Sequence, residues 1–294
     1  MTLSILIPTC NDSCIGLVQA LQAQAETLGG SYEIVVADDG STDEMVLAGN
    51  APIASLPHCR YIRREQNTGR AAIRNFLAKE AQYEHLLFID SDMTVCRQDF
   101  LKKYMETEGD VIDGGVAISL PQQGGARNGS SSLRYAYERS AEDEHTVEKR
   151  REHPYRDFHT ANFMIRRDLM LAHPFDERYR HYGYEDVAFG ITLKEHGIGI
   201  LHIDNPMGFQ TFESNEAFVS KTEEGLRTLH AFRDELHDYS RLLQKVEALP
   251  RPALSAIRCL HRLMGGCIRR NLTGSHPWLP LFNIYKLGYY LTNH

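Results

Sequence analysis

The feature that most constrains this chain is a series of short apolar runs, each followed by acidic or small polar residues. We expect strands at residues 3–7, 32–37, 60–62 and 86–89, and helices between them at 14–28 and 68–81. Strands that alternate with helices predict a parallel, doubly wound α/β sheet, which collects ligands at the carboxyl ends of its strands. Two acidic clusters, Asp38-Asp39 and Asp90-Ser91-Asp92, follow strands of this kind.

Composition and charge exclude several classes of protein. The net charge of −7 over 294 residues argues against a protein that binds nucleic acid through its surface. The six cysteines have no metal-site spacing, so we expect free thiols in a reducing compartment. The apolar start lacks the flanks of a signal peptide, and no run is long enough to cross a bilayer. We therefore expect a soluble, cytoplasmic protein, or one that lies on the inner face of the membrane.

Asp90, Ser91 and Asp92 leave the strand at 86–89, so both carboxylates lie near its tip. Neighbouring carboxylates repel each other unless a positive group lies between them. Hard divalent cations prefer oxygen ligands and often keep water and substrate phosphates in their remaining positions. The triplet therefore predicts a divalent metal site, and a polar turn is the alternative.

Asp38 and Asp39 end another strand and begin a turn. An aspartate here can accept a hydrogen bond from the imide N–H of uracil or thymine, or bind a ribose hydroxyl. Pro8, Thr9 and Asn11 end the first strand and could supply neighbouring contacts to the base. A purely structural turn is the alternative.

Asn67 and Gly69 precede a helix in which Arg70 and Arg74, four residues apart, share a face. We expect this helix start to meet a diphosphate through the arginines and free backbone N–H groups. A surface pair with Glu65 or Glu80 is the alternative.

Glu185 and Asp186 begin the last acidic cluster, in a predicted helix start. Acidic residues in a first turn are stabilised by the helix dipole, which would be a structural explanation. The functional interpretation is a carboxylate base that removes a proton from an acceptor hydroxyl.

The second half of the chain contains a polar loop and a helical C-terminal part. Residues 124–132 have the composition of a flexible loop, which we interpret either as an acceptor-binding lid or as a solvated excursion. A helix is expected from Ser214 onward, with apolar residues as far as Leu243 on one face, and Pro250 breaks it. The basic, amphipathic residues 250–294 either pack on the rest of the protein or lie on a membrane surface.

In their joint order these motifs resemble family-2 glycosyltransferases with the GT-A fold. The resemblance covers roughly residues 3–235 and is carried by residues 4–11, 36–43, 67–69, 74–75, 88–92, 162–167, 175–177 and 183–186. The last three segments also resemble the catalytic segment of the β-1,4-galactosyltransferases. The implied fold is a Rossmann-like, doubly wound mixed sheet in residues 1–235, with a helical extension in 236–294.

The resemblance also implies roles for the acidic residues. Asp38 or Asp39 binds the nucleobase, and Asp90 contacts the ribose or a water on the metal. Asp92 ligates Mg²⁺ or Mn²⁺. Asp186 is the catalytic base, and Glu185 beside it touches the acceptor.

A histidine often completes the metal site of such enzymes, in a run that reads Asn-Pro-Val-x-His. Here the run is Asn205 to Phe209, with Phe209 at the histidine position, and phenylalanine cannot ligate a metal. His202 is nearby in sequence. The third metal ligand is therefore open.

The resulting hypothesis is an inverting glycosyltransferase that moves a sugar from a nucleoside-diphosphate sugar, by preference a UDP-sugar, to an acceptor hydroxyl. The acceptor would be a glycan or a lipid-linked saccharide, in the synthesis of a cell-surface polysaccharide or glycoconjugate. A sugar nucleotidyltransferase is one alternative, although residues 1–20 lack the basic phosphate loop that it needs. A catalytically impaired nucleotide-sugar-binding protein is the other.

Overall fold

The computed structural model describes residues 2–118 and 131–293, so most of the predicted loop at 124–132 lies outside the described residues. The described residues form two compact units. The first takes the described part of Met1–Pro121 with Asp143–Arg180 and Glu185–Gln210, and the second takes the described part of Gln122–Glu142 with His181–Tyr184 and Thr211–His294.

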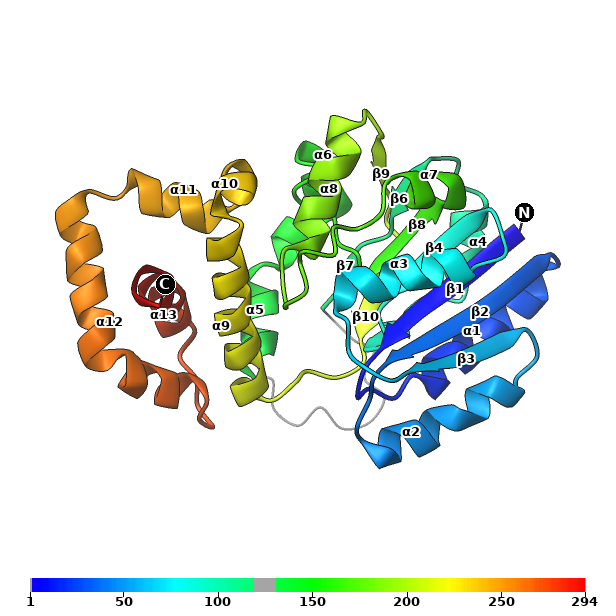
Figure 1. Cartoon of the computed structure of the whole chain (residues 1–294), viewed down its shortest axis with the longest axis horizontal. Coiled ribbons are helices and arrows are strands. Elements are labelled where there is room, and N and C mark those ends of the chain that lie inside the picture. The colour runs from blue at the N-terminus through cyan, green and yellow to red at the C-terminus, as the bar shows by residue number, and fades with distance from the viewer. Residues whose placement is uncertain (1, 119–130, 294) are drawn as a thin grey trace. The chain divides into compact units, whose positions relative to one another are not determined.

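The first unit contains strands and helices in alternation (Figure 1). Its strands are β1 (Thr2–Thr9), β2 (Ser31–Asp39), β3 (Cys59–Arg64), β4 (His85–Ile89), β5 (Met93–Val95), β6 (Val111–Asp113), β7 (Val116–Ala117), β8 (Asn162–Arg166), β9 (Ile200–His202) and β10 (Met207–Phe209). Its helices are α1 (Ile15–Leu28), α2 (Glu44–Asn50), the 3-10 turn η1 (Ala51–Ser55), α3 (Arg70–Glu80), α4 (Phe100–Met105), α6 (Val147–Glu152), α7 (Arg167–Ala172) and α8 (Glu185–Glu195). A further 3-10 turn, η2 (Glu142–His145), precedes α6.

The central sheet has the strand order β3-β2-β1-β4-β8-β6-β9. Strand β8 runs antiparallel to β4 and β6, and the other pairs are parallel. The predicted mixed α/β sheet is therefore confirmed, whereas the alternation of strands and helices alone predicted a parallel sheet. The chain moves outward from β1 to β3 and then returns to place β4 on the other side of β1. This reversal puts a topological switch point at the carboxyl ends of β1 and β4, where ligands bind in such sheets.

Alternate side chains of the sheet enter two cores. One is a single cluster in which Leu6, Val35 and Phe88 of the sheet pack with Leu77 of α3 and Phe189 of α8. The neighbouring strand residues point to the opposite face. Gln24 of α1 there exchanges hydrogen bonds with the segment that carries α4. Both faces are thus covered, which explains why the predicted strands are continuous apolar runs.

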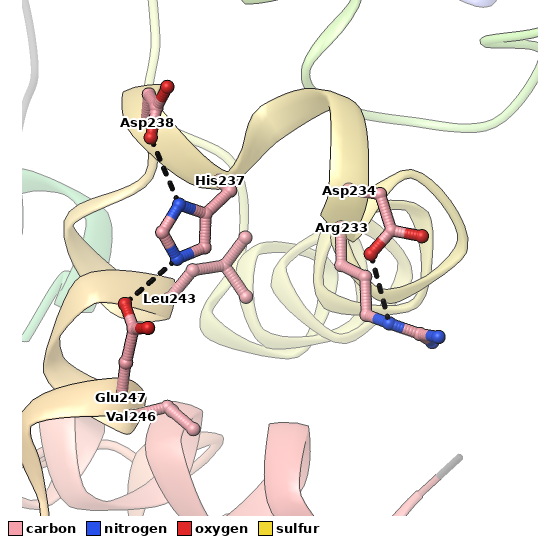
Figure 2. Close-up of a pocket in the computed structure, with 7 residues that line it drawn as sticks. All are labelled: Arg233, Asp234, His237, Asp238, Leu243, Val246 and Glu247. Carbon is pink, nitrogen blue, oxygen red and sulfur yellow. Dashed lines mark hydrogen bonds and ion pairs between the residues drawn. The ribbon is translucent and has the colours of Figure 1, made fainter.

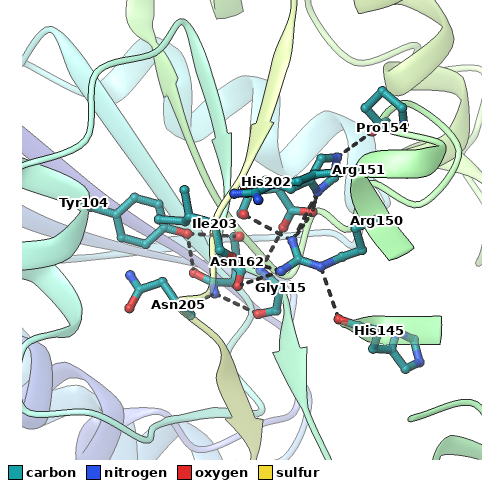
Figure 3. A network of polar contacts seen from close by, with 12 residues as sticks. Tyr104, Gly115, His145, Arg150, Arg151, Pro154, Asn162, His202, Ile203 and Asn205 are labelled. Atoms are coloured by element: carbon teal, nitrogen blue, oxygen red, sulfur yellow. Dashed lines mark hydrogen bonds and ion pairs between the residues drawn. The ribbon is translucent and has the colours of Figure 1, made fainter. Parts of the chain in front are cut away.

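One edge of the sheet is held by a buried guanidinium (Figure 3). Arg150 of α6 lies 3.1 Å from Oδ2 of Asp113 in β6, and it donates to the carbonyls of Gly114 and Ile203. His202 of β9 places Nδ1 2.9 Å from the same carboxylate oxygen and Nε2 2.9 Å from a backbone carbonyl. These contacts tie α6 to two strands that are neighbours in the sheet.

The second unit is helical in its described part, with α5 (Leu133–Ser140), α9 (Asn215–Ala231), α10 (Arg233–Leu236), the 3-10 turn η3 (His237–Tyr239), α11 (Arg241–Ala248), α12 (Arg251–Leu272) and α13 (Leu279–Thr292). Its core joins Leu133, Phe218, Ile268, Phe282 and other apolar residues. Helix α13 packs against both α9 and α12 (Figure 1). None of the described helices is long and apolar enough to cross a membrane.

The helix expected from Ser214 onward ends at Ala231, before Leu243. The Ser240 hydroxyl accepts a hydrogen bond from the amide of Leu243 and so starts a new helix, α11, within the predicted one. The predicted interruption at Pro250 is confirmed, because α12 begins at Arg251. The expected boundary between residues 235 and 236 lies inside the second unit, since α9 shares its core with α12 and α13.

We predict that Asp113→Asn lowers the free energy of unfolding by about 3–5 kcal/mol, because Arg150 then keeps a buried charge without its carboxylate. Burial raises the pKa of Asp113, but the His202 hydrogen bond and the Arg150 charge outweigh it, so this pKa lies below its ordinary value. The carboxylate's contribution is therefore complete above the unfolded pKa of about 3.9 and is lost as pH falls through the lower folded pKa.

Denaturant unfolding of the variant and of wild type as a function of pH checks this prediction. The exposed Asp110, 3.1 Å from Arg166, is a matched control, and Asp110→Asn should cost less than about 1 kcal/mol. Equal effects of the two substitutions would contradict the assigned role of Asp113.

Candidate active site

The loops that follow β1, β2 and β3 are joined by backbone and amide hydrogen bonds. Asn11 has a positive φ of 52°, its backbone N–H donates to the Ser41 hydroxyl, and its side-chain oxygen accepts from the amide of Thr42. A Cβ on Gly40 would lie 2.6 Å from the amide nitrogen of Asn67, so glycine allows the second and third loops to meet. The predicted site segments therefore converge at the carboxyl edge of the sheet.

Asp38 and Asp39 are almost completely buried, and each holds a loop. Asp38 accepts from the Ser41 amide and, at 2.6 Å, from the Tyr61 hydroxyl. Asp39 accepts from the amides that follow Asn67 and from Arg64. Sequence reasoning missed Tyr61 and Arg64, because the tertiary structure pairs their strand with the one that ends in Asp38 and Asp39.

Thr9, Pro8 and Ser91 also have local roles. The Thr9 hydroxyl donates to the carbonyl of Asp12 at 3.0 Å, which shapes the loop after β1. Pro8 pairs with Ala37 in the parallel ladder. Ser91 is buried after β4. These residues frame the edge of the sheet where a nucleobase was expected.

Gly69 is required by close packing. Its φ is +93°, and a Cβ there would lie 2.5 Å from the carbonyl oxygen of Arg180. Its amide donates to Asp39 and also to the side chain of Asn67, whose amide group contacts Cys10. This arrangement directs the start of α3 toward the segment that leads to α8.

Arg74 connects two acidic segments that are far apart in sequence. Its guanidinium is 1% exposed, with Nη2 2.6 Å from Asp90 and Nη1 3.4 Å from Glu185. Arg70, one helical turn earlier and 44% exposed, lies 3.6 Å from Asp90 and 3.9 Å from Glu185. The predicted shared face is confirmed. The alternative pairing with Glu80 is wrong, because Glu80 binds Arg60.

The ring of Phe175 lies beneath this guanidinium, 5.6 Å from the Arg74 Cζ atom. Asn75 holds the Phe175 segment by exchanging two backbone hydrogen bonds of 2.9 Å with it and by donating to Glu177. Adjacent residues of α3 therefore do different work: Arg74 binds the carboxylates, and Asn75 binds the loop that supports Arg74.

Glu185 and Asp186 form the first turn of α8, as predicted. The two preceding residues, Gly183 and Tyr184, have φ values of 94° and 69°, and the second is unfavourable for a bulky side chain. Burial raises the pKa of Glu185, reinforced by Asp186 and opposed by Arg70 and Arg74. Burial also raises the pKa of Asp186. A carboxylate of this kind is a stronger base than an exposed one.

The expected third metal ligand is absent from its predicted position. Phe209 pairs with Met93, and the next amide, of Gln210, donates to the Asp92 carbonyl, so the run does reach the acidic triplet. His202 cannot serve instead, because its Nδ1 contacts Asp113 and its Nε2 contacts the carbonyl of Pro154. His202 is therefore excluded as the third metal ligand.

The described residues contain no group of three or more His, Cys, Asp or Glu side chains placed to hold a metal ion. Asp90 contacts the two arginines, and Asp92 is the second carboxylate of the triplet. The residues therefore fit a Mg²⁺ or Mn²⁺ that is held by few protein ligands and completed by water and donor phosphates. They do not fit a cation enclosed by protein ligands alone.

A separate pocket of about 500 Å³ lies in the second unit (Figure 2). It is lined by Arg233, Asp234, His237, Asp238, Leu243, Val246 and Glu247. His237 bridges two of these carboxylates, at 3.0 Å and 2.9 Å, which raise the pKa of its imidazole. The bridge ties η3 to α11, and none of the predicted site residues lines the pocket.

Comparison with known proteins identifies the family of this chain. Residues 4–171, more than half of the chain, match the family described as Glycosyl transferase family 2. The chain therefore belongs to glycosyltransferase family 2.

Two bacterial relatives show the extent of this likeness. Chondroitin synthase of Escherichia coli is 26% identical over 239 residues, which cover 70% of this chain and 34% of the relative. Hyaluronan synthase of Pasteurella multocida is 25% identical over 280 residues, which cover 83% of this chain and 28% of the relative. The chain thus spans about a third or less of the length of these relatives.

Solved structures share the GT-A fold at low sequence identity. The structure of residues 1–349 of TarS of S. aureus in complex with UDP-GlcNAc has a TM-score of 0.50 and 17% identity, covering 99% of this chain and 90% of that chain. The mannosyltransferase PcManGT of Pyrobaculum calidifontis, in complex with GDP-Man and Mn²⁺, has a TM-score of 0.52 and 13% identity, covering 98% and 84%. At these identities the likeness establishes the fold.

We predict that Gly69→Ala lowers the free energy of unfolding by about 1–3 kcal/mol, because its Cβ meets the Arg180 carbonyl at a positive φ. Gly16→Ala is the matched control, since no atom lies within 4 Å of its added Cβ and it sits in helix α1. Thermal unfolding of both variants tests the difference. A Gly69 variant as stable as the Gly16 variant would show that the close approach is unimportant.

Proposed function

We propose that this protein is an inverting glycosyltransferase that transfers a sugar from a nucleoside-diphosphate sugar, by preference a UDP-sugar, to a hydroxyl of a glycan or lipid-linked saccharide. The observation that carries the proposal is the junction of Asp90 with Glu185 through Arg74. It brings the donor-side triplet to the start of α8, where Asp186 follows. The product would be part of a cell-surface polysaccharide or glycoconjugate.

The related proteins support the choice of donor and acceptor. Chondroitin synthase and hyaluronan synthase are named for polysaccharides, and TarS was solved with UDP-GlcNAc. The likeness of residues 162–186 to β-1,4-galactosyltransferases stays a prediction, because the family match ends at residue 171.

Arg70 and Arg74 have different proposed roles. Arg70 is 44% exposed, so its guanidinium can reach a diphosphate while remaining near Asp90. Arg74 is buried and acts as a positioning residue for Asp90 and Glu185. We assign the nucleobase to the loops that Asp38 and Asp39 order, with contacts from Pro8, Thr9 and Asn11. Asn67 and Gly69 precede the helix start that would meet the diphosphate, and Ser91 lies in the triplet on the donor side.

Asp186 is the proposed catalytic base. Its carboxylate takes the proton of the acceptor hydroxyl as that oxygen forms a bond to the anomeric carbon of the donor. The bond from this carbon to the diphosphate breaks, and its electron pair leaves with the diphosphate. Attack opposite the leaving group inverts the anomeric centre. Glu185, which is bound by Arg74, faces the acceptor beside the base.

A divalent cation at Asp92 would stabilise the negative charge of the departing diphosphate. Mn²⁺ is present in the PcManGT structure, which supports this expectation. The protein's own part is to offer the Asp92 carboxylate, while Arg70 adds positive charge nearby. A small ligand set makes retention of the cation depend on the donor phosphates.

A catalytically impaired nucleotide-sugar-binding protein is the second candidate, and Phe209 at the histidine position favours it. The two functions differ in one measurement. Metal-dependent release of UDP from UDP-sugars by the purified chain supports the enzyme, whereas thermal stabilisation by UDP-sugars without any turnover supports the impaired protein.

We predict that Asp186→Asn reduces turnover by about 10²–10⁴-fold while donor binding persists, because the amide cannot accept the acceptor proton. Glu195→Gln is the control, since this exposed carboxylate lies at the other end of α8. Steady-state rates of UDP release with acceptor, and calorimetric donor binding, measure the two effects. Unchanged turnover in Asp186→Asn would refute the assignment.

We also predict that kcat/KM falls with decreasing pH through an apparent pKa above the ordinary value for aspartate of about 3.9. Burial raises the pKa of Asp186 and disfavours its ionised form, and only the ionised form accepts a proton. Because Glu185 titrates beside it, the profile reports the pair. A rate that stays constant down to the ordinary pKa would contradict a catalytic base whose pKa is raised.

A further inference from the structure

Positive charge is segregated at the end of this chain. Residues 251–294 contain six Lys or Arg and no Asp or Glu, which gives +6. Since the whole chain carries −7, residues 1–250 carry −13. A segment of this composition is attracted to anionic surfaces, although the protein as a whole is acidic.

Helix α12 in this segment has an apolar face that the second unit does not cover. Leu260, Leu263, Met264 and Cys267 follow the helical spacing of three and four residues and are all exposed, with Leu263 78% exposed. The side of the same helix that adjoins Met264, with Ile268 and Leu272, is buried against α13 and α9. The apolar residues of this amphipathic helix are therefore divided between a packed side and an exposed side.

Arginines border the exposed apolar face. Arg258 and Arg262 lie four residues apart in one row, with Arg251 seven residues before Arg258 in the same row, and this row lies roughly 100–140° around the helix from Leu263. Arg270 lies seven residues after Leu263, on its side of the helix. All four are exposed. Long arginine stems can lie along an apolar surface while the charged ends reach phosphate groups.

We propose that the exposed face of α12 docks on an anionic lipid surface, with Leu260, Leu263 and Met264 inserted among the headgroups and the arginines bound to lipid phosphates. The 22 residues of α12, about 33 Å long, fit a helix that lies in the plane of the interface. A second copy of the chain is a poorer partner, because its basic segment would repel this one. Trp278, 60% exposed and the single tryptophan, is typical of an interfacial residue.

Co-sedimentation of the full chain with phosphatidylcholine vesicles, with and without phosphatidylglycerol, tests this proposal. We expect binding to the anionic vesicles, weakened by high salt, and at least about tenfold weaker binding for the double variant Leu263→Ser, Met264→Ser. Both side chains are exposed, so thermal unfolding and donor binding should be unchanged.

Met45→Ser is the matched control, because Met45 is 86% exposed but lies in α2, outside the basic segment. It should bind vesicles as wild type does. The proposal is overturned if wild type does not bind anionic vesicles, or if the double variant binds as well as wild type. It is also overturned if sedimentation velocity shows that the double variant dissociates a dimer, which would assign the face to self-association.

Discussion

The guanidinium of Arg74 is the interaction on which the candidate site depends. A charge that is 1% exposed is stable only with partners, and here the partners are carboxylates from β4 and α8, segments almost one hundred residues apart. Phe175 below the guanidinium and Asn75 beside it fix its position. The contact therefore determines where the two acidic segments meet. Its main effect is on the positions of Asp90 and Glu185, because the net contribution of a buried ion pair to the free energy of unfolding is small.

The same principle acts where α6 meets β6 and β9. Arg150 is buried against Asp113 and His202 and also satisfies backbone carbonyls, so every charge in the group has a partner (Figure 3). The two buried groups differ in how close they lie to solvent. The Arg74 group borders Arg70 and the start of α8, where a substrate could approach, whereas Asp113 and His202 are fully buried and have structural roles.

The acidic residues of the site are therefore of two kinds. Asp38 and Asp39 already accept hydrogen bonds from neighbouring loops, which orders the edge of the sheet. Asp186 is half-buried, and its pKa is raised by burial and opposed by the charges of Arg74 and Arg70. Burial therefore has different results at these carboxylates. Asp38 and Asp39 have several hydrogen-bond donors nearby and order their loops, whereas burial raises the pKa of Asp186.

The sequence predicted the strands and their acidic ends, and it predicted that Arg70 and Arg74 share a helix face. Local spacing determines which side chains lie together on a strand or helix. The first turn of α8 was predictable for the same reason. The tertiary structure alone decided three other features. These are the antiparallel direction of β8, the contact of His202 with Asp113, and the hydrogen bond from the Tyr61 hydroxyl to Asp38. These contacts join residues that are distant in sequence, and no local pattern specifies which buried polar groups will satisfy one another.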